Sequence, residues 1–482
     1  MTEALFRSPD FALAPPAAAA LHAALEPASG GARVASIECA VGDFSSVARG
    51  KVVGRADFVA LAGCRLPSVT FGLTLTGGEP EAVFGPLMPE SYLDLTLVPD
   101  LSTLVPQPGR AGTASVLCEP VGPLRGRSRD AAYCASELSP RAALRRVLAR
   151  LDAAGFAARV APELELFLVD RREAGGEISL HAPAARPGAV ARERACEAYS
   201  LERAAHFDDY FDALYAACRL QRIPVCGHAH EAAYSQFEVN FQPGEPLAQA
   251  DAVFRFKRLA RQVAAQFGFL ATFAPKPFLE QPGAGMHWHF SLHDKALLQA
   301  GGAEGHTNAF ASPDGRDRAA LSAFIGGLQR HADAAMAFFA PHDMAFDRIA
   351  LSDACPSSAS WGHDDRGVAF RIPAASARNR RIENRLPGGD ANPYLTVAAT
   401  LGLGLIGIEQ GLSPASESAG VALPRSLPAA CDALERSDAM RELLGDPLVE
   451  LFVALKRHES AERNACADPR QQWDLVHLVE QA

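Results

Sequence analysis

The spacing of apolar residues changes along the chain from the period of a strand to that of a helix and back. Between residues 31 and 119, short apolar runs are separated by turn residues, which predicts a small domain rich in strands. The Gly/Arg-rich stretch 122–130 follows and indicates a boundary. From about residue 130 to the end, helical and strand-like patterns alternate without an internal repeat. This pattern predicts a second, larger region of mixed α and β structure.

Apolar residues at helical spacing predict several helices in this second region. The first begins at Ser139 and Pro140, a capping residue and a favoured first helical residue, and ends at Gly155. The others are expected at 207–220, 251–267, 318–339 and 393–410. The polar, glycine-containing segments 175–194 and 299–317 are interpreted as excursions from the core.

Charged and imidazole side chains interrupt strand-like runs that are otherwise apolar. Residues 162–170 alternate with period two, so Glu163 and Glu165 share one face of the predicted strand. His287 and His289 share a face by the same rule, opposite apolar neighbours. Two acids on one face of an apolar strand are costly unless they have partners.

A third segment contains Glu231 and Glu238, separated by an odd number of positions. One flat strand would therefore direct these two carboxylates to opposite faces. A turn or bulge within 232–235 would bring both to one site. The sequence thus predicts an irregularity between the two glutamates.

Two further segments supply arginines. DRGVAFRIP contains Arg366 and Arg371, and RRIENRLP places Arg381, Glu383 and Arg385 on one face. Alone, each of these segments is more often a half-exposed strand or a structural polar group. Their recurrence in five separate apolar runs favours one shared site, in which the buried charges neutralise one another or bind ions and ligands.

Carboxylate oxygens with one or two imidazoles and no thiolate set suit Mg²⁺ or Mn²⁺ better than structural zinc. Nearby arginines would then bind phosphate or carboxylate groups. Together these groups predict a phosphoryl-transfer site. The sequence contains no G-x-x-x-x-G-K-[ST] loop, which argues against a P-loop nucleotide enzyme.

Composition and cysteine content limit the classes of partner and the cellular compartment that are expected for this protein. The 482 residues are 48% apolar and carry a formal charge of -10, which disfavours nucleic-acid and anionic-membrane partners. Ten cysteines without a C-x-x-C pair predict reduced, buried thiols in a cytoplasmic protein. Residues 1–30 are interpreted as an N-terminal arm and not as a signal peptide, and no apolar run is long enough to span a bilayer.

Six motifs in order resemble the glutamine synthetase family: PELELFLVD, HEAAYSQFEVNF, FAPKPF, PGAGMHWHFSL, WGHDDRGVAFRIP and RRIENRLPGGDANPYL. The resemblance implies an α+β, glutamine synthetase-like fold. A small N-terminal β-grasp domain would span 31–125. A large catalytic domain, with a curved antiparallel β-sheet flanked by helices, would span 130–482. It also implies a homododecamer of two hexameric rings, with active sites shared between neighbouring subunits.

The resemblance also implies roles for single residues. The ligands of one metal would be Glu165, Glu231 and Glu238. Those of the second would be Glu163, His287 and Glu383. The nucleotide would contact His289, Ser291, Arg371 and Arg381. The catalytic groups would be Arg366, Arg371 and Glu383. Glutamate would be held by Gly283, Arg348 and Arg385. Two Mg²⁺ or Mn²⁺ ions would serve each site, with ATP as co-substrate.

In such enzymes ATP phosphorylates the γ-carboxylate of glutamate, and an amine then displaces phosphate. Departures from the glutamine-forming members concern the amine. Gly72 lies near the place of an ammonium-binding aspartate, Ala354 replaces a flap glutamate with Asp353 adjacent, and Pro282 replaces an asparagine. These features resemble the γ-glutamylpolyamine synthetase branch, which serves polyamine catabolism and nitrogen metabolism, with putrescine or spermidine as acceptor. Ammonia, another amine such as ethanolamine, an alkylamine or aniline, and a non-catalytic relative are the alternatives.

Overall fold

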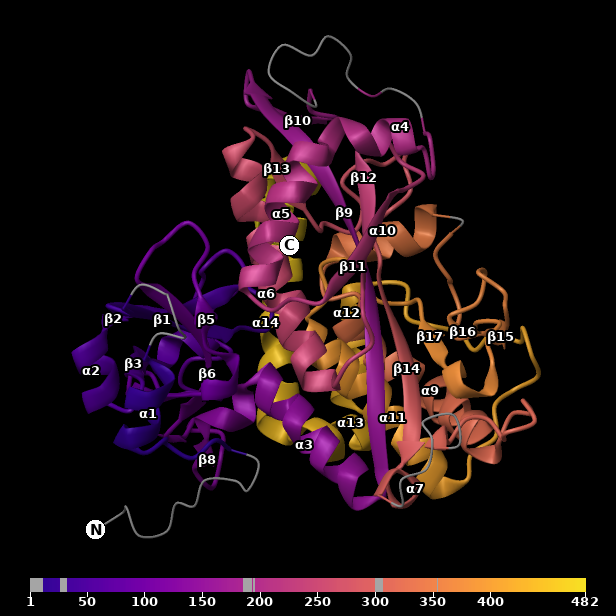
Figure 1. Cartoon of the computed structure of the whole chain (residues 1–482), viewed down its shortest axis with the longest axis horizontal. Coiled ribbons are helices and arrows are strands. Elements are labelled where there is room, and N and C mark those ends of the chain that lie inside the picture. Colours follow the sequence, from indigo (N-terminus) through magenta and orange to yellow (C-terminus); the bar gives the residue numbers. More distant parts are fainter. Residues whose placement is uncertain (1–11, 27–32, 185–192, 194–195, 300–306, 353) are drawn as a thin grey trace.

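The computed structural model describes residues 12–26, 33–184, 193, 196–299, 307–352 and 354–482. Figure 1 shows a small N-terminal unit lying beside a larger body that contains a long curved sheet and most of the helices. None of the helices among these residues is long and apolar enough to cross a membrane. All ten cysteines are described and are free thiols, although Cys196 and Cys226 are exposed and not buried as expected.

The N-terminal unit is built on a mixed sheet with the strand order β2-β1-β6-β4-β3, in which β5 also pairs with β6. Its central strands β1 and β6 are parallel and its other pairs are antiparallel. The strands are β1 (Ser36–Gly42), β2 (Ala48–Gly54), β3 (Cys64–Pro67), β4 (Asp94–Pro99), β5 (Val105–Pro106) and β6 (Thr113–Val121). The helices α1 (Ala18–Ala24) and α2 (Arg55–Ala60) contact each other, so part of the expected arm is a docked helix.

The large sheet has the order β11-β12-β9-β14-β17-β16-β15, with β10 and β13 also paired to β9. Its pairs are antiparallel except β15 with β16. The strands are β9 (Phe156–Ala174), β10 (Glu177–His181), β11 (Val225–His230), β12 (Gln236–Phe241), β13 (Leu270–Thr272), β14 (Met286–Asp294), β15 (Trp361–His363), β16 (Phe370–Ile372) and β17 (Ile382–Asn384). The long strand β9 runs the length of the body in Figure 1. A separate pair, β7 (Pro123–Leu124) and β8 (Tyr133–Cys134), lies at the expected boundary.

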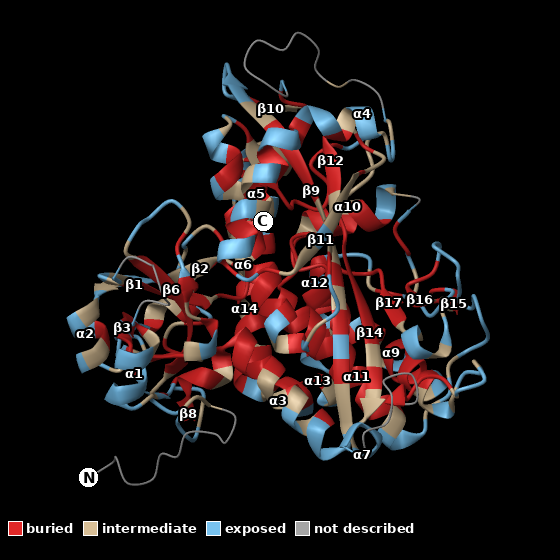
Figure 2. Ribbon diagram, viewed as in Figure 1, coloured by how far each residue is buried: buried red, intermediate tan, exposed pale blue. Residues whose placement is uncertain are grey.

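Helices pack around this sheet and enclose the core, which is drawn in red in Figure 2. They are α3 (Pro140–Ala153), α4 (Leu201–Ala204), α5 (Asp208–Leu220), α6 (Pro246–Gln266), α7 (Lys295–Gln299), α9 (Ala319–Phe339), α10 (Asp343–Leu351), α11 (Pro393–Gln410), α12 (Leu427–Glu435), α13 (Asp438–Leu444), α14 (Asp446–Ala465) and α15 (Val479–Gln481). A π-helix, Arg470–Leu478, precedes the last of these. Helix α11 is buried on nearly all sides, as its continuous apolar sequence requires.

The helices expected from the apolar spacing are all present. The side chain of Ser139 accepts a hydrogen bond from the Ala142 N–H, and Pro140 is the first residue of α3, as predicted. The segment expected as an excursion at 175–194 contains β10, which pairs with the end of β9 in a hairpin. Residues 185–192 and 194 of that segment lie outside the described residues.

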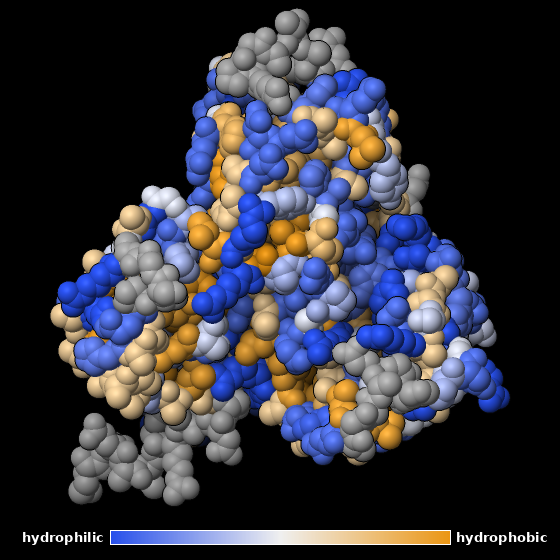
Figure 3. Space-filling view, in the orientation of Figure 1, coloured by the Kyte–Doolittle hydropathy of each residue, from blue (hydrophilic) through white to orange (hydrophobic). Residues whose placement is uncertain are grey.

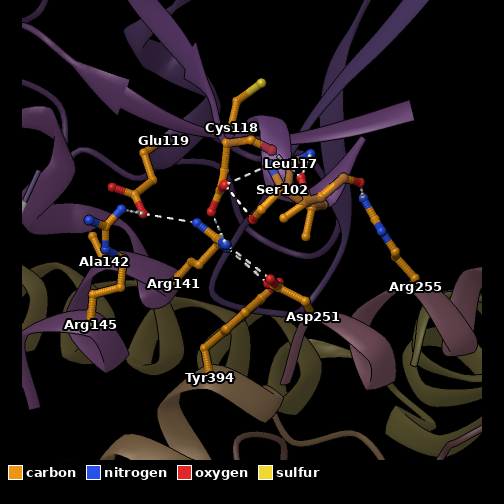
Figure 4. A network of polar contacts seen from close by, with 12 residues as sticks. Ser102, Leu117, Cys118, Glu119, Arg141, Ala142, Arg145, Asp251, Arg255 and Tyr394 are labelled. Carbon is orange, nitrogen blue, oxygen red and sulfur yellow. Dashed lines mark hydrogen bonds and ion pairs between the residues drawn. The ribbon is translucent and has the colours of Figure 1, made fainter. Parts of the chain in front are cut away.

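A buried ion network joins the N-terminal unit to the helices (Figure 4). Arg141 on α3 donates two hydrogen bonds to the Asp251 carboxylate, each 2.9 Å, and one to Glu119 on β6 at 3.1 Å. It also donates to Asp100 at 2.7 Å, and the Tyr394 hydroxyl donates to Asp251 at 2.8 Å. On the face shown in Figure 3, apolar residues gather along the same junction. These contacts hold the two parts as one unit.

Candidate active site

Strand register brings the predicted acids and histidines into one row across the large sheet. Glu238 on β12 lies directly opposite Glu165 on β9, and Glu163 on β9 lies opposite His287 on β14. Directly paired residues of an antiparallel sheet have Cβ atoms about 4.5–5.5 Å apart. The period-two prediction for these strands is therefore confirmed. The pairing brings the charged faces of β9, β12 and β14 together on one side of the sheet.

The row continues over the next two strands. His289 on β14 is paired with Glu383 on β17, which is paired with Arg371 on β16. The His289 ring and Glu163 are joined by a 2.8 Å hydrogen bond between Nε2 and Oε1. Arg371 donates to Glu383 at 2.9 Å. Acids, imidazoles and an arginine thus form one connected surface.

The turn expected between Glu231 and Glu238 is present. Strands β11 and β12 form a hairpin whose turn is closed by a 2.8 Å hydrogen bond from the Glu231 N–H to the Gln236 carbonyl. Ser235 in this turn has a φ of 58°, which few non-glycine residues adopt. The turn places the Glu231 carboxylate close enough to Glu165 to raise the pKa of that group.

Crowding of carboxylates perturbs their protonation. Burial and then Glu231 raise the pKa of Glu165 to about 7. Burial and then Glu163 raise the pKa of Glu238 to about 8. Burial also acts on Glu383, but His287, His289 and the neighbouring arginines outweigh it and lower its pKa to about 2. The carboxylates at the Glu165 end of the row therefore resist ionisation, whereas Glu383 is fully ionised at neutral pH.

The donors fit a hard divalent cation. Among the residues that the structure describes, two groups have ligand atoms within 4.8 Å of one another: Glu163 with His289 and Glu383, and Glu163 with Glu238 and His287. Carboxylate oxygens with one imidazole are ligands that Mg²⁺ and Mn²⁺ accept. These groupings differ from the expected division, because Glu163 belongs to both and His289 takes a ligand's place.

Glu165 is an expected metal ligand that belongs to neither of these groups, and it lies beside His287, which belongs to one of them. The Glu165 carboxylate accepts hydrogen bonds from the Gln236 amide and the Gly285 N–H, each 2.9 Å. His287 Nε2 lies 3.9 Å from Glu165 and its Nδ1 lies 3.8 Å from Glu383. Burial and the nearby arginines lower the pKa of His287 to about 3, so this ring is a neutral donor.

Arginines predicted to bind glutamate lie together beside Glu383. Arg385 donates to the Glu383 carboxylate at 2.7 Å, and Arg348 donates to the Leu386 carbonyl at 3.0 Å. A Cβ built at Gly283 would lie 2.8 Å from the Arg348 side chain, and one at Gly285 would lie 2.9 Å from its guanidinium. The same Cβ atoms would lie still closer to the Pro275 carbonyl, at 2.4 Å from Gly283, and to the His287 ring, at 2.5 Å from Gly285, so this close approach requires glycine.

A cavity of about 700 Å³ opens next to the row. Its lining includes Glu163, His289, Ser291 and Arg381, which the sequence assigned to a metal or to the nucleotide. Arg381 also donates to His289 Nδ1 at 3.2 Å. The volume lies within the range of small-molecule pockets. Arg381 in the cavity wall places positive charge beside the acids.

Some predicted residues lie apart from the row. Arg366 is exposed on the loop between β15 and β16, although it still lowers the pKa of Glu231 against the larger effect of burial. Gly72 is buried in the N-terminal unit, where a Cβ would lie 2.7 Å from the Phe84 ring. Packing therefore accounts for the missing side chain at this position. Asp353 lies outside the described residues.

One residue at the site gave no signal in the sequence. Tyr199 is 65% exposed, and its N–H donates to the His230 carbonyl at 2.8 Å, beside the hairpin that carries Glu231. Its φ of 61° is a strained conformation for an aromatic residue. Glu231 is the main cause that raises the pKa of this phenol. A single tyrosine in a polar segment has no periodicity, so only the fold could place it here.

An acidic row with arginines and a nucleotide-sized cavity is the arrangement of a phosphoryl-transfer enzyme. Residues 137–474 match the family described as glutamine synthetase, catalytic domain. The chain is 31% identical over 428 residues to the gamma-glutamylputrescine synthetase PuuA of Escherichia coli (strain K12), with 86% of each chain covered. It is 29% identical over 455 residues to the glutamate–isopropylamine ligase of a Pseudomonas species, covering 91% of this chain and 93% of that one.

Among solved structures, a GmaS/ADP complex aligns with a TM-score of 0.73 and 25% identity, covering 96% of this chain and 98% of that one. The chain belongs to the glutamine synthetase family. It is an ATP-dependent glutamate–amine ligase, and the expected α+β fold with an N-terminal β-grasp domain and a curved catalytic sheet is confirmed.

Divalent cations are expected to stabilise the folded protein. A cation among Glu163, Glu165, Glu231 and Glu238 would offset their mutual repulsion, and a hundredfold excess over the dissociation constant adds about 2.7 kcal/mol to the free energy of unfolding. Thermal unfolding with Mg²⁺, Mn²⁺ or a chelator measures this. Glu238→Gln is the matched variant: it should be more stable than the wild type in chelator and gain less from the metal. Equal gains in both proteins would contradict the role of Glu238.

Proposed function

We propose that this enzyme joins the γ-carboxylate of glutamate to a primary amine, a polyamine such as putrescine or spermidine, through γ-glutamyl phosphate. The observation that carries the proposal is the row of acids, imidazoles and arginines from Glu238 to Arg371, set beside a cavity of about 700 Å³. The similar GmaS structure, solved with ADP, supports a nucleotide in that cavity.

We propose that the acidic row binds two Mg²⁺ or Mn²⁺ ions per active site. Their ligands would come from Glu163, Glu165, Glu231, Glu238, His287 and Glu383, with His289 within reach of one ion. When bound, such ions neutralise phosphate charge during transfer. A neutral His287 and an ionised Glu383 are already in the protonation states that ligation requires.

The arginines of the site would position the substrates and neutralise their negative charge. Arg348 and Arg385, with the backbone at Gly283, would hold the α-carboxylate of glutamate by charge-assisted hydrogen bonds. Arg366 and Arg371 would neutralise the phosphates. A γ-carboxylate oxygen then forms a bond to the γ-phosphorus as the bond to ADP breaks.

In the second half, the amine nitrogen attacks the acyl carbon, phosphate leaves, and the nitrogen loses a proton. That proton is released to solvent, which reaches the edge of the row at the exposed Tyr199. The products are the γ-glutamyl amide, ADP and phosphate.

The nature of the amine is inferred from missing carboxylates and from relatives. Ala354 and Pro282 carry no group that could bind ammonium, and the two relatives described above act, by their names, on putrescine and isopropylamine. A cation-binding glutamate is replaced by a methyl group at Ala354, which leaves space for a substituted nitrogen. Ammonia is the second candidate, because Asp353 is adjacent in the sequence.

The acceptor can be tested directly. ADP formation with glutamate and Mg²⁺ would be measured across ammonia, putrescine, spermidine, ethanolamine, isopropylamine and aniline. The proposal predicts the highest kcat/KM for putrescine or spermidine, by about tenfold or more over ammonia. Preference for ammonia would show that Ala354 and Pro282 do not set the acceptor.

We also propose a homododecamer of two stacked hexameric rings in the cytoplasm. The support is membership of the family, together with the exposed position of Arg366 and Tyr199 at the site, where a neighbouring subunit could cover them. Mass photometry of the purified enzyme distinguishes this assembly from a hexamer or a smaller species.

A further inference from the structure

A set of ionisable side chains is buried near the segments that carry Arg348 and Arg385. Lys456 on α14 and His342, just before α10, are 0% and 2% exposed, and Asp390 and Glu459 are 1% and 2% exposed. The Lys456 ammonium donates to Ser45 Oγ at 2.9 Å, to His342 Nε2 at 3.1 Å and to Glu459 at 2.7 Å. All three of its N–H groups therefore have acceptors.

His342 connects Lys456 to the turn after β17. Because Nε2 of His342 accepts from Lys456, its Nδ1 carries the proton and donates to Asp390 at 2.8 Å. Asp390 follows Gly388 and Gly389, whose N–H groups each donate a 2.9 Å hydrogen bond, to the Phe339 and Ala284 carbonyls respectively. This turn therefore packs against the loop that contains Gly283.

The hydrogen-bonded pair joins the two segments that carry the arginines of the proposed glutamate pocket. His342 directly precedes α10, which carries Arg348, whereas Asp390 lies five residues after Arg385. Arg348 in turn donates to the Leu386 carbonyl, next to Arg385. The hydrogen bond between His342 and Asp390 thus closes a loop of contacts between the segment of Arg348 and the segment of Arg385.

The other end of the network reaches the N-terminal domain. Glu459 accepts a 2.6 Å hydrogen bond from the Leu75 N–H, and Ser45 also belongs to that domain. Burying several ions is costly, and apolar residues of the same volume would often give equal or greater stability. A purely structural role therefore does not require these groups, whereas fixing one geometry does.

We propose that His342 and Asp390, held by Lys456, are positioning residues that fix Arg348 relative to Arg385 for binding the α-carboxylate of glutamate. This inference rests on the proposed glutamate pocket. A displacement of the arginines by a fraction of an ångström should weaken glutamate binding, while the nucleotide cavity, which neither arginine lines, should be unaffected.

The test is the steady-state kinetics of Asp390→Ala, Asp390→Asn and His342→Gln. Asp390→Ala and His342→Gln should raise KM for glutamate by about tenfold or more, with KM for ATP changed less than about twofold. Asp390→Asn keeps a hydrogen-bond acceptor and should give a smaller increase. If the alanine variant does not fold, the asparagine and glutamine variants decide the result.

Two matched measurements make the outcome specific. Asp251→Asn removes a charge from the equally buried Arg141 network and should lower the unfolding temperature without changing KM for glutamate. Arg385→Ala, measured in parallel, tests the pocket itself. If Arg385→Ala raises KM for glutamate but folded His342→Gln and Asp390→Asn remain within about twofold of the wild type, the positioning role is refuted. If Arg385→Ala has no effect either, the proposed pocket fails. Equal increases in KM for ATP would also overturn the inference.

Discussion

Glu383→Gln is expected to lower amine-dependent ADP formation by at least about a hundredfold. Glu383 accepts hydrogen bonds from Arg371 and Arg385 at 2.9 and 2.7 Å and lies within reach of His287 and His289. Its low pKa means that the carboxylate is charged at every working pH. The neutral amide would leave the buried Arg385 without its counter-ion, would weaken the contact with Arg371, which keeps its ion pair with Asp364, and would remove one oxygen ligand of the proposed metal site.

This prediction is checked by single-turnover and steady-state ADP formation at saturating glutamate and ATP. The control is Glu409→Gln, which neutralises an acid of the exposed ion pair with Arg150 and should leave turnover unchanged. Circular dichroism establishes that both variants fold. Wild-type turnover in folded Glu383→Gln would remove this residue from the catalytic site.

Arg385→Ala is expected to raise KM for glutamate by about a hundredfold, with little change in KM for ATP. Arg385 is almost fully buried beside Glu383, and truncating one partner of a buried, hydrogen-bonded charge pair costs about 2–5 kcal/mol. The loss falls on glutamate because Arg385 lies with Arg348 and Gly283 and does not line the nucleotide cavity.

Initial rates over a wide range of glutamate, at fixed ATP and amine, measure this change. Arg457→Ala, which breaks an exposed ion pair with Glu435, is the matched control and should retain both KM values. A proportional rise in the two KM values would indicate general damage to the site and would argue against a carboxylate-binding role for Arg385.

Local pattern was sufficient for much of the fold. Period two in 162–170 and around His287 identified strands β9 and β14, and apolar spacing identified the long helices. The odd separation of Glu231 and Glu238 required a turn, and one is present. In each case a short-range rule, the direction of successive side chains, decided the result.

Features that depend on strand order could not be predicted in the same way. The pairing of β9 with both β12 and β14 explains why Glu163 is shared between two ligand groups. The periodicity of side chains along a strand does not reveal which strands pair with it. The contacts of Tyr199 and the buried set around Lys456 are also invisible in the sequence. Each joins residues that are far apart along the chain, and single polar residues in otherwise ordinary helices carry no local signal.

The most direct test of the central claim is a crystal structure of the enzyme with ADP and Mn²⁺, in which anomalous scattering locates the metal. We predict manganese peaks within about 2.5 Å of oxygens or ring nitrogens from Glu163, Glu238, His287 and Glu383, with ADP in the cavity beside His289 and Arg381. Manganese elsewhere on the protein, with these side chains still bonded only to one another, would contradict the account.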